Sequence, residues 1–287
     1  MPYNVKILEY NQEVWEEIPT KAVNTLQLFI TNRCNLRCTA CFYSKKLGKE
    51  EMGIEDYRKQ VSENLKGIEK VILLGGEPTL HSKLEDLISF NRNQGLKTTI
   101  YTNGYKLKRL ENFDLEKNTV RIGVYGSYSS EKPLSKIEKT SVPATIVYML
   151  RNDNVHELME AAKIAEEFNC KRFFISSIRD IMQTRDYWKD NENTLPLDEY
   201  SNIVQDFVNN YDGNLELHIA RRGVLKSKKY STKVDKCRFG NVFPNGKKII
   251  CPFDISLEKY SDNLIFGKRK CNKNDNCLLT KIVLKRK

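Results

Sequence analysis

Apolar and β-branched residues recur in short runs along the first two thirds of the chain. Such runs predict strands that are covered on both faces, because a strand buried in this way is apolar throughout. Between the first two runs, Ile54, Tyr57, Val61 and Leu65 fall on one face of a helix. Alternating strands and helices are typical of a parallel α/β sheet. The six predicted strands are Asn24–Thr31, Lys70–Leu74, Leu96–Thr102, Thr119–Tyr125, Ala144–Leu150 and Lys171–Ser177.

Two further helices are predicted after the fifth and sixth strands. The first contains Asn154 followed three residues later by Glu157, which fits a helix N-cap with its reciprocal glutamate. The second covers Leu197–Tyr211, because Pro196 suits a helix start and Gly213 follows its end. The apolar face of the first of these helices consists of Val155, Leu158, Met159, Ala162 and Ala165.

The pattern changes after residue 213. One more strand is predicted at Leu215–Ala220, and a basic stretch follows, before four of the eight cysteines fall within Cys237–Cys277. Closely spaced cysteines predict a unit stabilised by metal. We therefore divide the chain into an N-terminal extension (1–21), a core (22–212) and a cysteine-rich unit (213–287).

Composition indicates a folded chain that stays in the cytoplasm. Of 287 residues, 40% are hydrophobic and 30% charged, which is ordinary for a globular protein. No run approaches the roughly 20 apolar residues that cross a bilayer, and the first residues lack the order of a secretory signal. We expect no membrane partner. Eight cysteines without an export signal indicate metal ligation or catalysis rather than disulfides.

The positive net charge leaves two interpretations open. With 48 Lys and Arg against 37 Asp and Glu, the chain carries +11 and could attract nucleic acid, an acidic peptide or an anionic surface. The lysines are scattered, however, and such a distribution favours an ordinary solvated surface. We do not expect a nucleic acid partner from charge alone.

Three cysteines directly follow the first predicted strand. Cys34, Cys38 and Cys41 place three thiols on one loop at the carboxyl end of a strand, where ligands gather in parallel α/β folds. A cubane iron–sulfur cluster has four irons, so three thiolates leave one iron open to another ligand. A zinc site or simple buried thiols are the alternatives.

The spacing C-x3-C-x2-C resembles the radical S-adenosylmethionine (radical SAM) superfamily. The resemblance implies a partial (β/α)6 TIM-type barrel, a [4Fe-4S] cluster whose open iron chelates S-adenosylmethionine, and reductive cleavage to a 5′-deoxyadenosyl radical. Further motifs follow in order: Gly75-Gly76-Glu77-Pro78 ends the second strand, and Thr102-Asn103-Gly104 ends the third. In the family such motifs bind the cofactor, and the two glycines also permit close backbone approach to a ligand.

Three residues after the fourth and fifth strands complete the cofactor site that the resemblance implies. Asn154 matches an Asn found after the fifth strand in many members, and Arg151 could face the cofactor carboxylate. Ser127 or Tyr125 could substitute for a serine that meets the ribose in other members. The residue before the third cysteine is usually aromatic in the superfamily, whereas here it is Ala40, with Phe42 and Tyr43 after Cys41.

The last four cysteines predict a second metal site. Asn245-Gly246 is a two-residue hairpin signal, so the chain should fold back there and place Cys251 opposite Gly240. The arrangement resembles the SPASM or twitch extensions of radical SAM enzymes, which implies one auxiliary [4Fe-4S] cluster. Four cysteines also suit zinc, which remains the alternative. The ligands would be Cys237, Cys251, Cys271 and Cys277.

The resemblance implies hydrogen abstraction from a peptide or peptide-like substrate, leading to oxidation, crosslinking or epimerisation in natural-product maturation. An oxidoreductase of this kind needs a flavodoxin- or ferredoxin-type electron donor. The alternatives are a small metabolite such as a sugar or amino acid, RNA modification, and a non-catalytic metal-binding regulator. The three histidines show no ligand spacing and are interpreted as structural or surface residues. Candidate substrate-facing residues are Tyr125, Tyr148, Arg179 and Cys170, of which Cys170 is mainly interpreted as a buried structural thiol.

Overall fold

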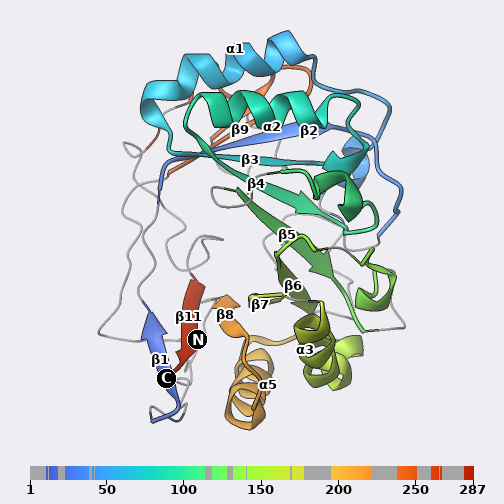
Figure 1. The fold of residues 1–287 in the computed structure, drawn as a ribbon, viewed down its shortest axis with the longest axis vertical. Coiled ribbons are helices and arrows are strands. Elements are labelled where there is room, and N and C mark those ends of the chain that lie inside the picture. The colour runs from blue at the N-terminus through green and yellow to red at the C-terminus, as the bar shows by residue number, and fades with distance from the viewer. Residues whose placement is uncertain are drawn as a thin grey trace.

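The computed structural model of the protein shows one curved sheet with helices on its outer side (Figure 1). Its strands run in the order β1-β11-β8-β7-β6-β5-β4-β3-β2-β9-β10. The structure describes residues 11, 13–18, 23–38, 41, 43–113, 118–127, 132–139, 141–168, 170–177, 195–220, 238–250, 260–264, 266 and 281–287.

Six parallel strands in chain order form the centre of the sheet, and they confirm the predicted fold class of a partial (β/α)6 barrel. Each predicted run is a strand, with its ends shifted by one residue at most. The predicted strand after residue 213 is also present as β8 (Glu216–Ala220), and it pairs in parallel with the sixth. The six are β2 (Thr25–Thr31), β3 (Lys70–Gly75), β4 (Lys97–Thr102), β5 (Asn118–Val124), β6 (Ala144–Leu150) and β7 (Arg172–Ser177).

Strands from both ends of the chain extend this sheet at its edges. At one edge, β9 (Phe239–Val242) runs parallel to β2 and continues into β10 (Lys248–Ile249). At the other, β11 (Lys281–Arg286) pairs antiparallel with β8, and β1 (Trp15–Ile18) pairs with β11. Described residues on both sides of residue 213 therefore belong to one sheet, and the division of the chain at that point stays a prediction.

The hairpin predicted at Asn245-Gly246 is present, but its register was wrong by one residue. Lys248 pairs with Val242, whereas Cys251 opposite Gly240 would require Ile249 at that position. The reason is the loop length. The Phe243 amide donates to the Lys247 carbonyl at 3.0 Å, so three residues rather than two form the turn. Gly246 has a φ of +76°, as a three-residue loop of this type requires.

Four α-helices are described on the outer side of the sheet: α1 (Ile54–Asn64), α2 (Leu84–Asn93), α3 (Leu158–Glu167) and α5 (Leu197–Asn210). α1 and α2 each have two acidic residues in the first turn, which favours the helix dipole. Sequence analysis missed α2. Short 3-10 helices are η1 (Ser44–Lys46), η2 (Leu65–Gly67), η3 (Pro78–Leu80), η4 (Leu107–Leu110), η5 (Leu134–Lys136) and η6 (Asn152–Glu157).

The prediction that Asn154 caps a helix was wrong. Asn154 lies inside η6, and α3 begins only at Leu158. Its side-chain oxygen accepts the backbone N–H of Arg151 at 2.8 Å, and its side-chain nitrogen donates to the carbonyls of Tyr125 and Met149. Asn154 therefore joins the ends of β5 and β6 instead of starting the helix.

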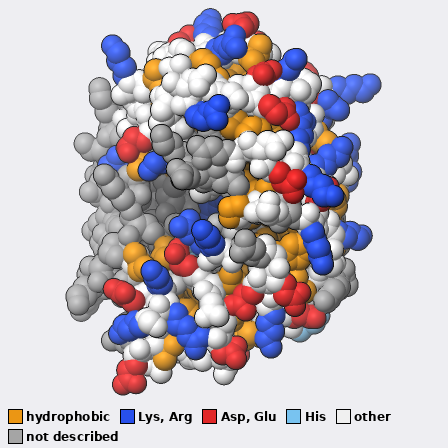
Figure 2. Space-filling model, viewed as in Figure 1, with side chains coloured by type: hydrophobic (Ala, Val, Ile, Leu, Met, Phe, Trp, Pro, Cys, Tyr) orange, Lys and Arg blue, Asp and Glu red, His pale blue; other side chains and the backbone are white. Residues whose placement is uncertain are grey.

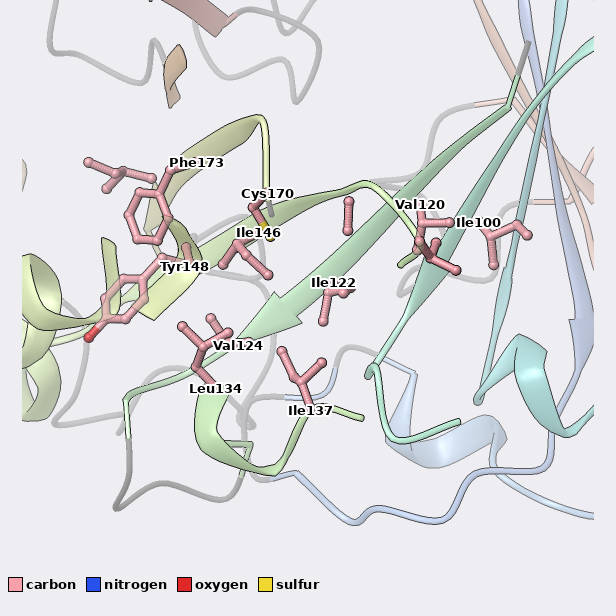
Figure 3. Close-up of a cluster of buried hydrophobic side chains, with 14 of the residues drawn as sticks. Ile100, Val120, Ile122, Val124, Leu134, Ile137, Ile146, Tyr148, Cys170 and Phe173 are labelled. Atoms are coloured by element: carbon pink, nitrogen blue, oxygen red, sulfur yellow. The ribbon is translucent and has the colours of Figure 1, made fainter. Parts of the chain in front are cut away.

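Alternate residues of each strand face the helices. On β5, Val120, Ile122 and Val124 belong to the main hydrophobic core, which Leu134 and Ile137 cover from outside (Figure 3). Successive side chains of a strand point to opposite faces, so Arg121 and its alternates lie on the inner face. The core thus fixes which residues face inward.

The inner face has an apolar half and a polar half. Under β2, β3 and β9 it is filled by stacked rings: Phe29 lies 4.9 Å from Tyr43 and 4.8 Å from Phe243 between ring centroids. The inner positions of β4 to β8 include polar and charged residues such as Thr99, Arg121 and Glu216. In Figure 2 the molecule is hollowed on the face seen in Figure 1, and Lys and Arg side chains lie at this hollow.

Candidate active site

The turn after β3 is packed directly against the segment that leads into the cysteine loop. The amides of Gly76 and Glu77 donate to the carbonyls of Thr31 and Arg33, both at 2.7 Å. A Cβ atom on Gly76 would lie 2.1 Å from the Arg33 carbonyl oxygen, and one on Gly75 would lie 2.3 Å from that of Thr31. The two glycines are thus required here because two stretches of backbone touch. Sequence analysis had explained the same glycines by close approach of the backbone to a ligand.

The carboxylate of Glu77 connects the turn after β3 to the end of β4. Oε1 accepts the backbone amide and the hydroxyl of Thr79 and the hydroxyl of Thr102, the last at 2.6 Å. Oε2 accepts the amide of Asn103 at 2.6 Å. The side chain is 2% exposed, and a buried carboxylate is stable there because four donors surround it. The carboxylate is thus satisfied within the protein, and it fixes the turn after β3 against the end of β4.

A third link ties the end of β4 to the cysteine loop. The Asn103 side chain donates to the Asn35 side chain at 2.8 Å, and Asn35 directly follows Cys34. Gly104 has a φ of +84°, and a Cβ there would lie 2.8 Å from Ile122. The structure thus brings together the three motifs that lie apart in the sequence. We call this joined region, made of Asn35, Gly75–Pro78 and Thr102–Gly104, the cofactor edge.

Cys34, Cys38 and Cys41 are half-buried thiols on the loop beside the cofactor edge. Burial raises the pKa of Cys34 and of Cys41, and the charge of Cys34 raises the pKa of Cys41 further. Two influences oppose this: the amide of Leu36 donates to the Cys34 sulfur at 3.4 Å, and Lys132 and Arg37 lie close enough to favour thiolates. The loop therefore places three thiols, with Lys132 and Arg37 nearby, on one side of the sheet edge.

Lys132 is a site residue that sequence analysis missed. Burial lowers its pKa, while the charges of Glu77 and of the three cysteines raise it, so the ammonium group lies near both motifs. It also lies over the Tyr125 ring at 5.8 Å. No motif surrounds it in the sequence. The only signal for Lys132 in the sequence was its position after the strand that contains Gly123. Gly123 leaves room for the lysine, because a Cβ on Gly123 would lie 3.0 Å from the Lys132 Nζ.

These residues fit an iron–sulfur cluster and its ligand. Three thiols from one loop match a cubane that keeps one iron open, and the nearby cations compensate the charge of thiolates. Cys34, Cys38 and Cys41 would hold the irons, and the adjacent cofactor edge offers backbone groups to a molecule bound at the open iron. When bound, the cluster and S-adenosylmethionine supply a carbon-centred radical.

The ends of β5 and β6 contribute a second group of predicted residues. The amide and hydroxyl of Ser127 both donate to Glu157, at 2.5 and 2.9 Å. Arg151 is 5% exposed, forms an ion pair with Asp153 and lies over the Tyr125 ring at 5.4 Å. Together with Asn154, these contacts place Tyr125, Ser127 and Arg151 side by side. Their predicted roles in cofactor binding stay predictions.

Two candidate substrate-facing residues lie on the other side of the sheet. Tyr148 is fully buried among the outer core residues, and its hydroxyl donates to the Asn154 carbonyl at 2.8 Å. Cys170 lies in the same cluster, before the first residue of β7 and so at the opposite end of the strand from the cysteine loop (Figure 3). Burial raises its pKa to about 12. Both side chains face the helices, so the structure does not bring them to the inner face; their predicted roles stay predictions.

Several predicted residues lie outside the described part of the chain. Arg179 is one, and the four proposed auxiliary ligands are the others: Cys237, Cys251, Cys271 and Cys277.

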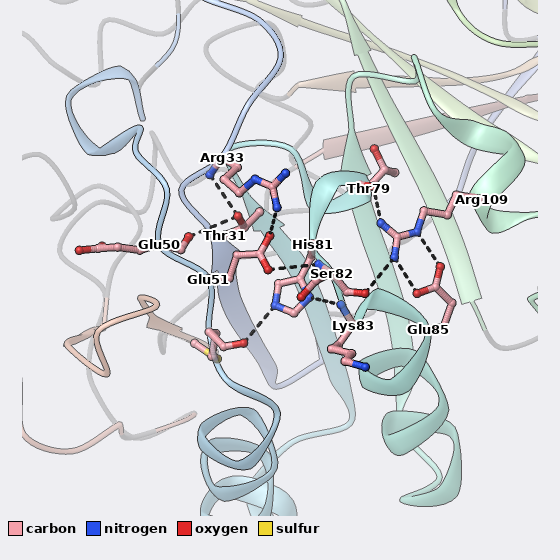
Figure 4. Close-up of polar contacts among 11 residues, drawn as sticks. Thr31, Arg33, Glu50, Glu51, Thr79, His81, Ser82, Lys83, Glu85 and Arg109 are labelled. Carbon is pink, nitrogen blue, oxygen red and sulfur yellow. Dashed lines mark hydrogen bonds and ion pairs between the residues drawn. The ribbon is translucent and has the colours of Figure 1, made fainter.

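A network outside the cofactor edge holds its surroundings in place (Figure 4). Arg109 donates to the Thr79 carbonyl at 2.8 Å and pairs with Glu85. His81 is buried, and the Lys83 amide donates to its Nδ1 at 3.1 Å, so Nε2 carries the proton that is given to the Met52 carbonyl. Burial lowers the His81 pKa. This histidine is structural, as its isolated position in the sequence indicated.

The curated relatives share only part of this chain. A stretch of 112 residues is 37% identical to 7,8-dihydro-6-hydroxymethylpterin dimethyltransferase of Methanocaldococcus jannaschii, covering 36% of this chain and 22% of that protein. Another of 131 residues is 31% identical to GTP 3′,8-cyclase of Aquifex aeolicus, covering 41% and 40%. The chain thus spans less than half the length of either relative.

Solved structures of similar fold cover most of the chain. Streptococcus suis SuiB bound to precursor peptide SuiA superposes with a TM-score of 0.62 at 14% identity, over 86% of this chain and 63% of that one. Native anSMEcpe with bound AdoMet and the Cp18Cys peptide gives 0.61 at 20% identity, over 88% and 80%. These likenesses show the fold. No helix in the described part of the chain is long and apolar enough to cross a membrane.

The match to a family model is what decides the family. Residues 28–195 match the model described as the Radical SAM superfamily, and this range contains the cysteine loop and the whole cofactor edge. Members of the family are enzymes that use a [4Fe-4S] cluster and S-adenosylmethionine. The chain belongs to the radical SAM superfamily.

Proposed function

We propose that the protein abstracts a hydrogen atom from a peptide or peptide-like substrate, as an oxidoreductase-type enzyme that oxidises, crosslinks or epimerises it. One observation carries this proposal. The two peptide-bound structures match 86% and 88% of the chain, which is more than the residues before 213 can supply. The fold likeness therefore continues past the family core into the region that carries the last four cysteines.

The proposed reaction has two steps, cleavage of the cofactor and hydrogen abstraction, and an oxidation adds a third. One electron from a flavodoxin- or ferredoxin-type donor cleaves S-adenosylmethionine into methionine and a 5′-deoxyadenosyl radical. That radical takes a hydrogen atom from a substrate C–H bond and becomes 5′-deoxyadenosine, which leaves a carbon radical on the substrate. In an oxidation, this radical then loses one electron and one proton.

An auxiliary [4Fe-4S] cluster is the electron acceptor that this proposal assigns to the last step. Its ligands would be Cys237, Cys251, Cys271 and Cys277. A cluster with four protein ligands has no open iron, so electron transfer or a structural role is what remains for it. Strands β9 and β10, which lie between the first two of these cysteines, pair next to β2, so this part of the chain is anchored beside the strand that leads to Cys34.

Side chains of this chain have three roles in the proposal. Cys34, Cys38 and Cys41 hold the first cluster, and Lys132 balances the charge of their thiolates. Glu77 fixes the backbone of the cofactor edge through its four hydrogen bonds. The polar half of the inner face receives the substrate.

The test is whether hydrogen moves from a peptide to the cofactor. The anaerobically reconstituted full chain is incubated with S-adenosylmethionine, a reductant and a pool of peptides from a culture grown on deuterated nutrients. We expect deuterium in 5′-deoxyadenosine by mass spectrometry, and none from the variant with Cys34→Ala, Cys38→Ala and Cys41→Ala. A chain that never cleaves S-adenosylmethionine under these conditions contradicts the proposal.

Iron content tests the auxiliary cluster separately. Two clusters predict about eight irons per chain, falling to about four in the triple variant. A wild-type content of about four, with zinc bound to the remaining cysteines, would support the zinc alternative.

A small metabolite is the second candidate, favoured by the names of the sequence relatives. These act on a pterin and on GTP. The same deuterium assay with deuterated mixtures of free amino acids, sugars and nucleosides separates the two. Transfer from such a mixture but not from the peptide pool would select the second candidate.

A further inference from the structure

An arginine on the inner face of β5 lies between two aromatic rings. The guanidinium carbon of Arg121 is 5.2 Å from the Tyr101 ring centroid and 5.1 Å from that of Phe174. Its Nη1 donates to the Tyr101 hydroxyl oxygen at 2.7 Å. Contact with two rings and a hydroxyl restricts the orientation of the planar guanidinium group.

The register places this arginine in a row of polar side chains across the sheet. Arg121 pairs with Tyr101 on one side and with Thr145 on the other, and Thr145 pairs with Arg172. All four alternate with residues of the outer core, so they share the inner face.

Positive charge accumulates on this face. Lys70, Lys97 and Arg172 lie at inner positions near Arg121, and we call these four residues the inner cationic face. Burial and the charges of the other three lower the pKa of Lys70 to about 8. Glu216 is paired with Arg172 at 3.1 Å. Among the residues that the structure describes, no carboxylate forms an ion pair with Arg121.

The local chemistry suits an anion. Tyr101 accepts a hydrogen bond from Arg121, so its own hydroxyl hydrogen can be donated to another group. The remaining N–H groups of a guanidinium form a fork that matches two oxygens of a carboxylate or phosphate. Arg121 and Tyr101 thus offer converging donors at one point.

The position suits a substrate that also reaches the cofactor. Arg121 lies three residues before Val124, the last residue of β5, which corresponds to about 10 Å along the strand. The cofactor edge lies at the carboxyl ends of the neighbouring strands. A single peptide residue or small molecule can therefore span the distance from Arg121 to the edge.

We propose that Arg121, with Tyr101, binds an oxyanion group of the substrate, either a carboxylate or a phosphate, on the inner face of the sheet. The inference rests on the proposed function, since it places the substrate in front of the same site. In this proposal Arg121 is a specificity-determining residue that selects acidic substrates.

Three small probes that share one backbone test the proposal. They are the N-acetyl methylamides of glutamate, glutamine and phosphoserine, titrated into the anaerobically reconstituted full chain at fixed ionic strength and followed by ligand-observed NMR. We expect the glutamate or phosphoserine probe to bind about 10-fold or more tightly than the neutral glutamine probe. Whichever anion binds better identifies the source of the oxyanion.

Variants assign the preference to the residue. Arg121→Gln should abolish it. Arg58→Gln is the matched control, because Arg58 also lies over a ring, that of Phe90 at 5.8 Å, but on an outer helix; it should keep the preference. Equal binding of all probes to the wild type, or an unchanged preference in Arg121→Gln, overturns the proposal.

Two further measurements cover the remaining outcomes. If Arg121→Gln does not fold, Arg121→Lys retains the charge without the fork and should bind the anionic probes several-fold more weakly than wild type; equal affinity overturns the proposal. Probe binding needs no turnover. A chain that prefers anions but never cleaves S-adenosylmethionine disproves the proposed function alone, whereas cleavage without any anion preference disproves this inference alone.

Discussion

The cofactor edge and the inner cationic face are two polar regions of one sheet that differ in how their charges are satisfied. At the edge, the Glu77 carboxylate accepts four hydrogen bonds from the protein itself. On the inner face, Arg121 has a hydroxyl and two rings, and Lys70 lies among like charges. The carboxylate at the edge therefore has its partners within the protein, whereas Arg121 on the inner face keeps donors for a ligand.

A satisfied polar network fixes backbone, whereas an unsatisfied one leaves donors for another molecule. Every family-motif side chain at the cofactor edge is used to join β3, β4 and the cysteine loop. The charged side chains of the inner face are held in position but retain bonding capacity. Chemistry common to the family thus resides in a rigid edge, and what distinguishes this chain is expected on the inner face.

The largest expected effect comes from crowding the cofactor edge. Gly76→Ala puts a Cβ 2.1 Å from the Arg33 carbonyl oxygen, so either the turn or the cysteine loop must move. We expect the free energy of unfolding to fall by about 4 kcal/mol or more, together with loss of iron on reconstitution. Urea denaturation and iron analysis measure the two effects.

Gly48→Ala is the matched control for that change. A Cβ on Gly48 would meet nothing closer than the Asn32 Cβ at 3.9 Å, an ordinary contact. It should leave stability and iron content close to wild type. Similar losses in both variants would show that the edge is no tighter than an ordinary loop.

The contrast between the regions also explains what sequence could predict. The six core strands follow from apolar runs, and Cys34, Gly76 and Thr102 follow from short motifs with fixed spacing. The tight contact behind Gly75 and Gly76 could not be predicted, because it depends on how two strand ends meet. Lys132 and Arg121 have no motif; their positions depend on the inward alternation of β5 and on tertiary packing. The outward position of Tyr148 could not be predicted for the same reason, since one residue of register decides which face a side chain occupies.

A smaller loss is expected from weakening the Glu77 network without adding bulk. Glu77→Gln removes the charge and turns one acceptor into a donor that faces the Asn103 amide or the threonine hydroxyls. We expect about 3 kcal/mol of destabilisation and weaker S-adenosylmethionine binding. Glu85→Gln is the control, because Glu85 forms a half-exposed ion pair with Arg109. It should lower the free energy of unfolding by about 1 kcal/mol or less. Equal costs would remove the distinction between buried network and surface pair.

Removing a charge from the inner cationic face should raise the free energy of unfolding, whereas the substitutions at the cofactor edge lower it. The Lys70 pKa is about 8 in the folded state against an ordinary 10.5, so between these values the unfolded chain binds the extra proton and stability rises with pH. Below pH 8 both states are charged and the burial cost is fully present. Lys70→Met should therefore stabilise the fold near pH 7 by about 2 kcal/mol, less than the full shift implies because the side chain is partly exposed.

The pH profile of the difference between variant and wild type provides the measurement. The gain from Lys70→Met should shrink as pH rises through the window from about 8 to 10.5. Lys97→Met, on the exposed residue that pairs with Lys70, should show little change. A destabilised Lys70→Met would mean that the inner face is already balanced by other groups and is not short of an anion.

The smallest effect concerns how tightly the cofactor edge is tied to the cysteine loop. Asn103 is 4% exposed and donates to Asn35 at 2.8 Å, which is the hydrogen bond that joins the third motif to the first. A double-mutant cycle with Asn35→Ala and Asn103→Ala should give a coupling of about 1 kcal/mol in urea unfolding. Asn103 also accepts the Tyr105 amide, so its single substitution should cost more than that of Asn35. A coupling near zero would mean that the loop carrying Cys34 is held only through Thr31 and Arg33, and that the edge is two units rather than one.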